Sequence, residues 1–514
     1  MEKRESVFLF ISLFIWVGII AYISLTRNYF GYGTETDFLG GFIIEAQRLV
    51  SGQALTLEFH PPLYASVLAL FQIVIDDWFL TGRILSLVSY TVALITSFFF
   101  FRLLVGNAAG WGALFSLMAS SVMVFFSTLT TSDIFFYAIY TSTLLLATSA
   151  FKKKSLVLWA ISGVLIALAI LTRSNGFTLL ALLFLPWIDT STNQEKIRNT
   201  VVLFTGTLLP LLLWAAIANY SGSPFMPAGN HANLALTYFS PVNDRLSGDA
   251  RMLVESQFHS LWQVISYDPL HMAKQYLGDL KELLMNIFFS DKLVRTPIFL
   301  FLIPGMVLLL IRQDRLTFFY LFILTFSQVL LVNLKYFEPR YHLYLVPLYG
   351  VALAICCEKM ASLIKIKLKP EFANVTIAVA ITALIALIPA AKNIIYVNSQ
   401  AKFADIELHD SVNRTAGMTP KGAWIIARKP HMAYYNDGKY SILPNVKTYA
   451  ELNDKLAEFA RSAPVYVYFG QKEASTRPQF KELISANVEQ IPWLLPKATS
   501  STPDNWVLYE YKAR

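Results

Sequence analysis

Long apolar runs constrain the fold of this chain more than any other feature of its sequence. Of its 514 residues, 55% are hydrophobic and 15% are charged, whereas about 25% of residues are charged in an average soluble protein. A helix needs roughly 20 apolar residues to cross a bilayer. About eleven runs meet or approach this length, at 7–25, 79–104, 111–127, 134–151, 155–172, 176–188, 200–218, 296–311, 317–334, 341–358 and 373–391. The sequence therefore predicts a polytopic α-helical membrane protein with about eleven transmembrane helices.

Basic residues indicate how these spans are oriented, because cytoplasmic loops are enriched in Lys and Arg. If the N-terminus is cytoplasmic, every inner turn is basic, with residues Lys3, Arg4, Arg102, Lys152, Lys153, Lys154, Lys196, Arg198, Arg312, Arg315, Lys359, Lys365, Lys367 and Lys369. The net charge of +8 is explained by these loops better than by nucleic-acid binding. No small-residue cleavage site follows the first run, so we interpret it as an uncleaved span.

This orientation places three segments on the outer face, namely 26–78, 219–294 and the tail 392–514. The long loop contains helical patches. In the tail, charges rise and apolar runs shorten, with strand patterns at 422–430, 463–470 and 505–512 and a helical pattern at 448–461. We therefore expect a membrane module over 1–391 and a small soluble α/β domain over 392–514.

The first outer segment holds ionisable residues at the boundary of the membrane. The stretch from Thr36 to Gly52 has a helical pattern, which Thr36 or Asp37 would cap and Gly52 would end. A plain N-cap is the alternative reading of Asp37. His60 precedes two prolines that force an abrupt helix start, so His60 is expected at the same boundary as Asp37.

Asp133 is a second acidic candidate, in the sequence STLTTSDIFF at the outer end of two spans. It too has the alternative role of an N-cap. Two carboxylates on one face of the membrane would supply a base together with a further acceptor, or a metal locus. The cysteines offer no such site, since Cys356 and Cys357 are adjacent in an apolar run without metal-site spacing.

Three arginines are basic candidates at outer span ends. Arg173 lies in the tight hairpin LTRSNG, Arg340 lies in the charged cluster KYFEPRYH, and Arg83 is a weaker candidate in TGRILS. Arginines at span ends commonly extend to the interface. The hairpin and the cluster favour another role, because arginine binds phosphate bidentately and stays charged when partly desolvated. Tyr341, Tyr344 and Tyr349 are interpreted as interfacial or packing residues.

A base and several phosphate-binding cations beside lipid fit one chemistry, which is the transfer of a group from a lipid phosphate to a nucleophile. The carboxylate would deprotonate the acceptor, a step worth about 10²- to 10⁴-fold in rate. The arginines would stabilise charge on the departing phosphate.

The same motifs resemble the GT-C glycosyltransferases. The likeness is to the branch that contains the protein O-mannosyltransferases and the lipid A aminoarabinose transferase, a glycosyltransferase family 39-like group. Four features appear in the same order as in that branch, namely Asp37 in the first outer loop, the run from Gly52 to Tyr64 that ends in HPPLY, the hairpin LTRSNG and the segment EPRYHLYLVPL. The resemblance implies an inverting transferase with a polyprenyl-phosphate-linked monosaccharide as donor. By resemblance, Asp37 matches the catalytic base, and Arg173 and Arg340 match donor-phosphate positions that His60 assists.

The chain departs from that pattern where Phe38 and Leu39 follow Asp37, since members often place a second acidic residue there. The branch works without metal, so the resemblance implies neither a metal nor another cofactor. The expected partners are the donor lipid, the bilayer and a glycan, lipid or protein acceptor, and no nucleic acid. The expected location is a bacterial inner membrane with the C-terminal domain in the periplasm.

Three other functions remain open from the sequence. A polysaccharide polymerase or ligase with a lipid-diphosphate donor would use the long loop, with His231, Arg245 and Arg251. A lipid-linked sugar transporter or flippase is disfavoured because the chain shows no repeated halves and keeps its charges at one face. In an inactive scaffold, Asp37 and Arg340 would be dispensable. Neither the sugar nor the acceptor follows from these residues.

Overall fold

The computed structural model describes most of the chain, namely residues 3–27, 37–57, 60–189, 191–227, 230–240, 254, 256–294, 297–311, 314–332, 334, 338–363, 370–402, 405–485, 491–500 and 506–512. The chain forms two compact units. The first contains Met1–Arg27, Glu45–Asn230 and Leu261–Ala401, and the second contains Asn28–Ile44, His231–Ser260 and Lys402–Arg514. Parts of both expected outer loops therefore belong to the same unit as the C-terminal residues.

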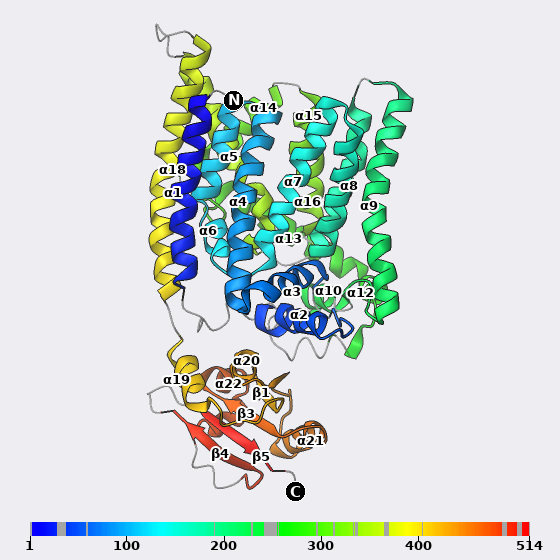
Figure 1. The fold of residues 1–514 in the computed structure, drawn as a ribbon, viewed down its shortest axis with the longest axis vertical. Coiled ribbons are helices and arrows are strands. Elements are labelled where there is room, and N and C mark those ends of the chain that lie inside the picture. The colour runs from blue at the N-terminus through cyan, green and yellow to red at the C-terminus, as the bar shows by residue number, and fades with distance from the viewer. Residues whose placement is uncertain are drawn as a thin grey trace. The chain divides into compact units, whose positions relative to one another are not determined.

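Long helices run side by side in the first unit (Figure 1). The helices up to residue 402 are α1 (Lys3–Leu25), η1 (Phe38–Phe42), α2 (Ile43–Val50), α3 (Leu63–Ile75), α4 (Trp78–Leu104), α5 (Asn107–Ala119), α6 (Ser121–Ser127), α7 (Ser132–Lys153), α8 (Leu156–Thr172), η2 (Ser174–Ile188), α9 (Asn193–Ser221), α10 (Asn230–Phe239), α12 (Leu261–Tyr267), α13 (Pro269–Phe289), η3 (Ile298–Phe301), α14 (Leu302–Ile311), α15 (Arg315–Phe318), η4 (Phe319–Leu324), α16 (Thr325–Val332), η5 (Pro339–Leu345), α17 (Val346–Leu363) and α18 (Pro370–Lys402).

All the predicted spans fall on helical segments. Within the described residues, six helices are long and apolar enough to cross a membrane, and the pair α5 and α6, bent by 67°, makes a seventh if it counts as one span. Helices α8, η2 and the pair η3 and α14 are shorter apolar segments. Apolar side chains such as Phe14 and Leu213 are exposed on the bundle, as lipid contact requires. A multi-pass membrane protein is thus confirmed, whereas eleven crossings stay a prediction.

The bend between α5 and α6 has a local cause in Ser120. Its backbone is extended, and its hydroxyl accepts the Met123 N–H at 3.3 Å as the cap of α6. The same hydroxyl donates to the Leu293 carbonyl at 2.8 Å. This bend turns α6 so that its end leads directly into the start of α7, where the candidate site begins.

The expected helical patches of the long outer loop are present as α10, α12 and α13. Helix α13 is anchored to the bundle by two buried or half-buried tyrosines. Tyr276 donates to the Leu330 carbonyl at 2.9 Å, and Tyr349 donates to the Ile287 carbonyl at 2.6 Å. Tyr349 is therefore a packing residue, as expected.

The C-terminal residues form a mixed sheet with helices on its faces, and its predicted α/β character is confirmed. Its elements are α19 (Ile406–Thr415), β1 (Trp424–Ala427), α20 (His431–Tyr435), β2 (Lys439–Ile442), α21 (Tyr449–Ala460), β3 (Val465–Phe469), α22 (Gln471–Thr476), η6 (Pro478–Ile484), β4 (Leu494–Thr499) and β5 (Val507–Tyr511). The strand order is β2-β1-β3-β5-β4, in which β2, β1 and β3 are parallel and β5 and β4 are antiparallel to their neighbours.

Strands β1, β3 and β5 and helix α21 lie where the sequence pattern predicted them, whereas β2 and β4 were not predicted. Alternating residues explain why the central strands were recognisable. In β1, Ile426 packs into the core on one face of the sheet, and Ile425 and Ala427 pack into the core on the other. Strand β2 is only partly buried and β4 is exposed at several positions, so neither carries a strong apolar pattern.

Candidate active site

Asp133 is at the centre of the candidate site, in the first turn of α7. Thr131, not Asp133, is the N-cap, because its hydroxyl accepts the Asp133 N–H at 3.2 Å. The Thr131 hydroxyl also lies 2.6 Å from Asp133 Oδ2, to which it donates. The N-cap alternative for Asp133 is therefore wrong. Its carboxylate is buried, at 3% exposure, and is left to interact with other side chains.

Arg173 reaches Asp133 from the end of α8. The hairpin turns sharply here, because Arg173 has an extended backbone and η2 begins directly after it. Gly176 permits this turn, since a Cβ atom there would lie 2.4 Å from the Ala169 carbonyl carbon. Arg173 Nη1 lies 2.9 Å from Asp133 Oδ1 and donates to Ser132 Oγ at 2.9 Å. The tight hairpin thus holds the guanidinium group largely out of solvent, at 13% exposure of the side chain.

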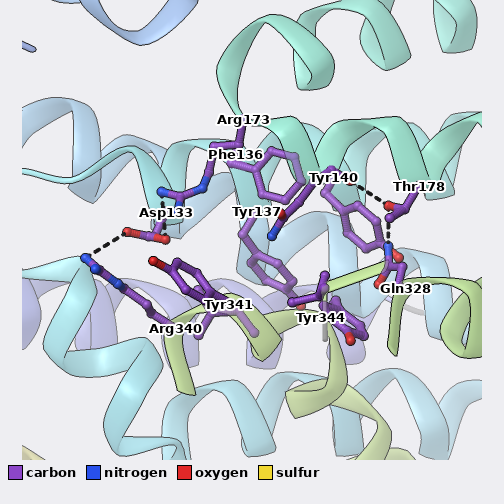
Figure 2. A pocket seen from close by; sticks show the side chains of 13 residues that line it. Asp133, Phe136, Tyr137, Tyr140, Arg173, Thr178, Gln328, Arg340, Tyr341 and Tyr344 are labelled. Atoms are coloured by element: carbon purple, nitrogen blue, oxygen red, sulfur yellow. Dashed lines mark hydrogen bonds and ion pairs between the residues drawn. The ribbon is translucent and has the colours of Figure 1, made fainter. Parts of the chain in front are cut away.

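Arg340 approaches the same carboxylate from η5. Its Nη1 lies 4.0 Å from Asp133 Oδ2, and its Nε lies 2.6 Å from Glu338 Oε1. Both guanidinium groups point toward Asp133, and the Tyr341 ring lies against both of them (Figure 2). The ring centroid is 5.6 Å from the Arg173 guanidinium carbon and 5.3 Å from that of Arg340. Tyr341 therefore spaces the two cations as well as packing beside them.

The charges of this cluster balance, because two arginines face the carboxylates of Asp133 and Glu338. The two acids are not equivalent. Burial raises the pKa of Glu338 above its ordinary value, and Asp133 adds to this effect, while Arg340 opposes it. Glu338 therefore takes up a proton more readily than an ordinary glutamate.

A small hollow, open at its mouth, extends from the ion pairs into the bundle. Its lining residues are Asp133, Phe136, Tyr137, Tyr140, Arg173, Asn175, Thr178, Gln328, Val332, Arg340, Tyr341, Leu343 and Tyr344. In Figure 2 the two arginines lie at one end and Gln328 at the other. Gln328 Nε2 donates to Thr178 Oγ1 at 3.2 Å. Five of these thirteen residues are aromatic and six are polar or charged, and such convergence of polar groups beside aromatic rings is typical of a small-molecule site.

The remaining predicted residues do not line this hollow. Arg83 is fully buried and donates to the Arg27 carbonyl at 2.9 Å, which links α4 to the end of α1. His60 is half-buried in the turn before α3. Asp37 is exposed in the second unit, at the start of η1, and its side chain makes no cap hydrogen bond to that helix. Arg245 and Arg251, named above for the polymerase or ligase alternative, lie outside the described residues.

Several lining residues were not predicted as site residues. Tyr137 and Tyr140 lie four and seven positions after Asp133, so helical spacing alone places all three on one face of α7. Gln328 is a buried polar residue in an apolar run, which is itself an indication of function in a membrane helix. Tyr341 and Tyr344 were interpreted as interfacial or packing residues, but they line the hollow.

The sequence and the fold of the whole chain can be compared with those of known proteins. No curated protein sequence matches the chain. Residues 59–218 match the family model of dolichyl-phosphate-mannose-protein mannosyltransferase. The structure is similar to ArnT from Cupriavidus metallidurans in the apo state, with 12% identity and a TM-score of 0.57 over 98% of each chain.

ArnT bound to undecaprenyl phosphate is also similar, with a TM-score of 0.53 and 12% identity over 100% of this chain and 99% of that one. This chain has the GT-C glycosyltransferase fold. The Archaeoglobus fulgidus oligosaccharyltransferase in complex with Zn and sulfate shares the GT-C fold at 14% identity and a TM-score of 0.56, over 96% of this chain and 72% of that one. The resemblance to GT-C proteins predicted from the short sequence motifs is confirmed.

Proposed function

We propose that this protein is an inverting glycosyltransferase that moves a monosaccharide from a polyprenyl-phosphate donor to an acceptor at the outer face of the membrane. One observation carries the proposal. Arg173 and Arg340 come from separate helices and converge on Asp133 at the mouth of an aromatic hollow within the bundle. The family match over residues 59–218 and the lipid phosphate named for one ArnT structure support the same substrate class.

The donor phosphate binds at the two arginines. A phosphodiester carries one negative charge and presents two oxygens, which match the paired donors of a guanidinium group. Asp133 holds Arg173 more closely than Arg340, since the two Nη1 atoms lie 2.9 Å and 4.0 Å from its carboxylate. Asp133 then acts as the counter-ion that holds Arg173 in place before the donor arrives. This role replaces that of a separate acceptor site.

The sugar occupies the hollow beyond the phosphate. Aromatic rings from α7 and η5 offer apolar faces, and Asn175 and Gln328 offer amide groups that can hydrogen-bond to hydroxyls. The polyprenyl chain extends toward the lipid. This arrangement leaves the anomeric carbon next to the phosphate, where the bond must break.

Transfer is a single displacement. The acceptor oxygen forms a bond to the anomeric carbon as the bond from that carbon to the phosphate oxygen breaks, so the configuration inverts. Asp37 accepts the acceptor's proton, a contribution of about 10²- to 10⁴-fold. The electron pair leaves with the polyprenyl phosphate, whose added charge the arginines stabilise. His60 assists at the phosphate, and Arg83 keeps the structural role that its buried contact gives it.

We place the reaction at the periplasmic face of a bacterial inner membrane, with a cytoplasmic N-terminus. Every predicted inner turn is basic, which supports this orientation. The acceptor is a glycan, a lipid or a protein, and reaches the site from the outer face. No metal takes part in the proposed step.

A transfer assay tests this function. The purified protein in lipid is given a panel of radiolabelled polyprenyl-phosphate monosaccharides with membrane-extract acceptors, and wild type is compared with Asp37→Asn. Product from wild type, lost in Asp37→Asn while donor binding is kept, supports the proposal. Product of equal amount from both variants removes Asp37 as the base. Transfer only from lipid-diphosphate oligosaccharides moves the protein to the polymerase or ligase class.

A further inference from the structure

A basic turn of the C-terminal sheet lies against the first-loop segment within the second unit. Gly40 packs on Pro430, and a Cβ atom built on Gly40 would be 3.2 Å from Pro430 Cγ. Any side chain at position 40 would therefore press on this ring. Lys429, next to Pro430, interacts electrostatically with Asp37, which precedes η1. Two segments almost 400 positions apart in the sequence thus meet at Asp37.

The sheet fixes the position of this turn. Arg428 and Lys429 directly follow β1, whose two neighbours are both parallel to it. The Arg428 N–H donates to Glu473 Oε1 at 3.2 Å, and the Tyr440 hydroxyl donates to the Arg428 carbonyl at 3.0 Å. The chain leaves β1 for β2 on one side, and β3 lies on the other. The carboxyl ends of parallel strands at such a reversal of strand order are common sites of function in α/β sheets.

The charge environment of Lys429 requires an anion. Its side chain is half-buried, and burial lowers its pKa below the ordinary value, with Arg428 adding to this effect. Asp37 opposes both by stabilising the ammonium form. His431 also lies within electrostatic range of Lys429, but its own pKa is lowered by burial to about 3, so it brings no positive charge near neutral pH. A half-buried cation beside a second cation is costly unless a carboxylate compensates it.

We propose that Lys429, which follows β1 of the C-terminal sheet, is a positioning residue for Asp37. The role rests on the proposed function, in which Asp37 is the base. The ammonium group attracts the Asp37 carboxylate and favours its ionised form, and Gly40 lets the two segments approach closely. A base must be ionised to accept a proton, so Lys429 sets the lowest pH at which transfer proceeds.

The pH dependence of transfer tests this role. A carboxylate that loses a nearby cation binds its proton more tightly. In Lys429→Gln, we expect the acid limb of the transfer profile to move to higher pH by about 1 unit. Lys429→Arg keeps the charge and should retain the wild-type limb. Lys421→Gln is the matched control, because Lys421 lies in the turn before β1, pairs with Asp437 and is 88% exposed.

A disulfide tests the contact without any activity measurement. The Cβ atom built on Gly40 lies 3.6 Å from Pro430 Cβ, within the roughly 3.5–4.5 Å range of disulfides. The double variant Gly40→Cys with Pro430→Cys should form a bond on mild oxidation, read by mass spectrometry of the linked peptides. The two single variants serve as controls for bonds to the natural cysteines. Cys356 and Cys357 are buried, so no such bond is expected.

The outcomes separate this inference from the proposed function. The positioning role is supported if the disulfide forms and if the acid limb of the transfer profile moves in Lys429→Gln but not in Lys429→Arg or Lys421→Gln. A disulfide without a shift overturns that role, and absence of the disulfide overturns the contact. If wild type transfers nothing from any donor, the proposed function fails. The disulfide experiment still tests whether the segments at Gly40 and Pro430 are in contact.

Discussion

Arg173 Nη1 lies 2.9 Å from Asp133 Oδ1, and this ion pair joins the end of α8 to the start of α7. The side chains are only 13% and 3% exposed. A pair so far from water is unlike a surface salt bridge, because each charge depends on the other for its solvation. Removal of either partner should therefore destabilise the protein, and the pair holds Arg173 in the position where we propose that the donor phosphate binds.

Asp133→Asn should destabilise the protein by about 3 kcal/mol, because it leaves the buried Arg173 charge without its carboxylate. Thermal unfolding in detergent measures this. Added polyprenyl phosphate should raise the unfolding temperature of the variant more than that of wild type, since the ligand supplies the missing anion.

Asp76→Asn is the control for that experiment, because Asp76 is exposed and its left-handed backbone at the end of α3 suits asparagine. Equal unfolding temperatures for wild type and Asp133→Asn would show that the ion pair contributes little. Equal ligand-induced shifts would argue that no phosphate binds at Arg173.

Donor binding should strengthen as the pH falls. The pKa of Glu338 is raised by burial, so Glu338 takes up a proton before an ordinary glutamate does. Protonation removes the carboxylate that pairs with Arg340 and frees this arginine for the phosphate. The donor phosphodiester keeps its charge over the same pH range, so its own titration does not oppose the rise in affinity at low pH.

Equilibrium binding across pH, in wild type and Glu338→Gln, measures this dependence. The glutamine variant mimics the protonated acid, so its affinity should be high and nearly independent of pH. A slope in Glu338→Gln equal to that of wild type would place the responsible group elsewhere.

Tyr341 should matter through its ring rather than its hydroxyl. The ring contacts both guanidinium groups, with distances of 5.3 and 5.6 Å to its centroid. Tyr341→Phe keeps the ring and should bind the donor within about twofold of wild type. Tyr341→Ala removes two cation–π contacts of about 1 kcal/mol each and should weaken binding by up to about 30-fold. A large loss in Tyr341→Phe would instead assign the role to the hydroxyl.

The membrane character and the elements of the C-terminal domain could be predicted because each has a strong periodic signal. Apolar runs mark helices, and the alternation in β1, β3 and β5 marks buried strands. Strands β2 and β4 carry no such signal, because they are edge strands with partly exposed residues. The bend at Ser120 was also missed, since serine both caps and interrupts helices and the apolar run continues across it.

The candidate site was predictable in its residue types but not in its pairings. The sequence identified Asp133, Arg173 and Arg340 as charged residues at span ends. It did not show that Asp133 binds both arginines, because three-dimensional packing decides which span ends meet. The alternative role of Asp133 as a cap is wrong, because Thr131, two residues earlier, takes the cap position. Lys429 was missed because nothing in its local sequence relates it to Asp37.

The central claim is that Arg173 and Arg340 bind the phosphate of a polyprenyl donor, and equilibrium binding tests it most directly. Polyprenyl phosphate and the matching neutral polyprenol are titrated into wild type, Arg173→Gln and Arg340→Gln, with the exposed Arg198→Gln as control. Wild type should prefer the phosphate, and each site substitution should weaken phosphate binding by about 10- to 100-fold, the loss of one charge-assisted contact, without changing polyprenol binding. Equal affinity of wild type for both lipids, or unchanged phosphate binding in both site variants, would contradict the account.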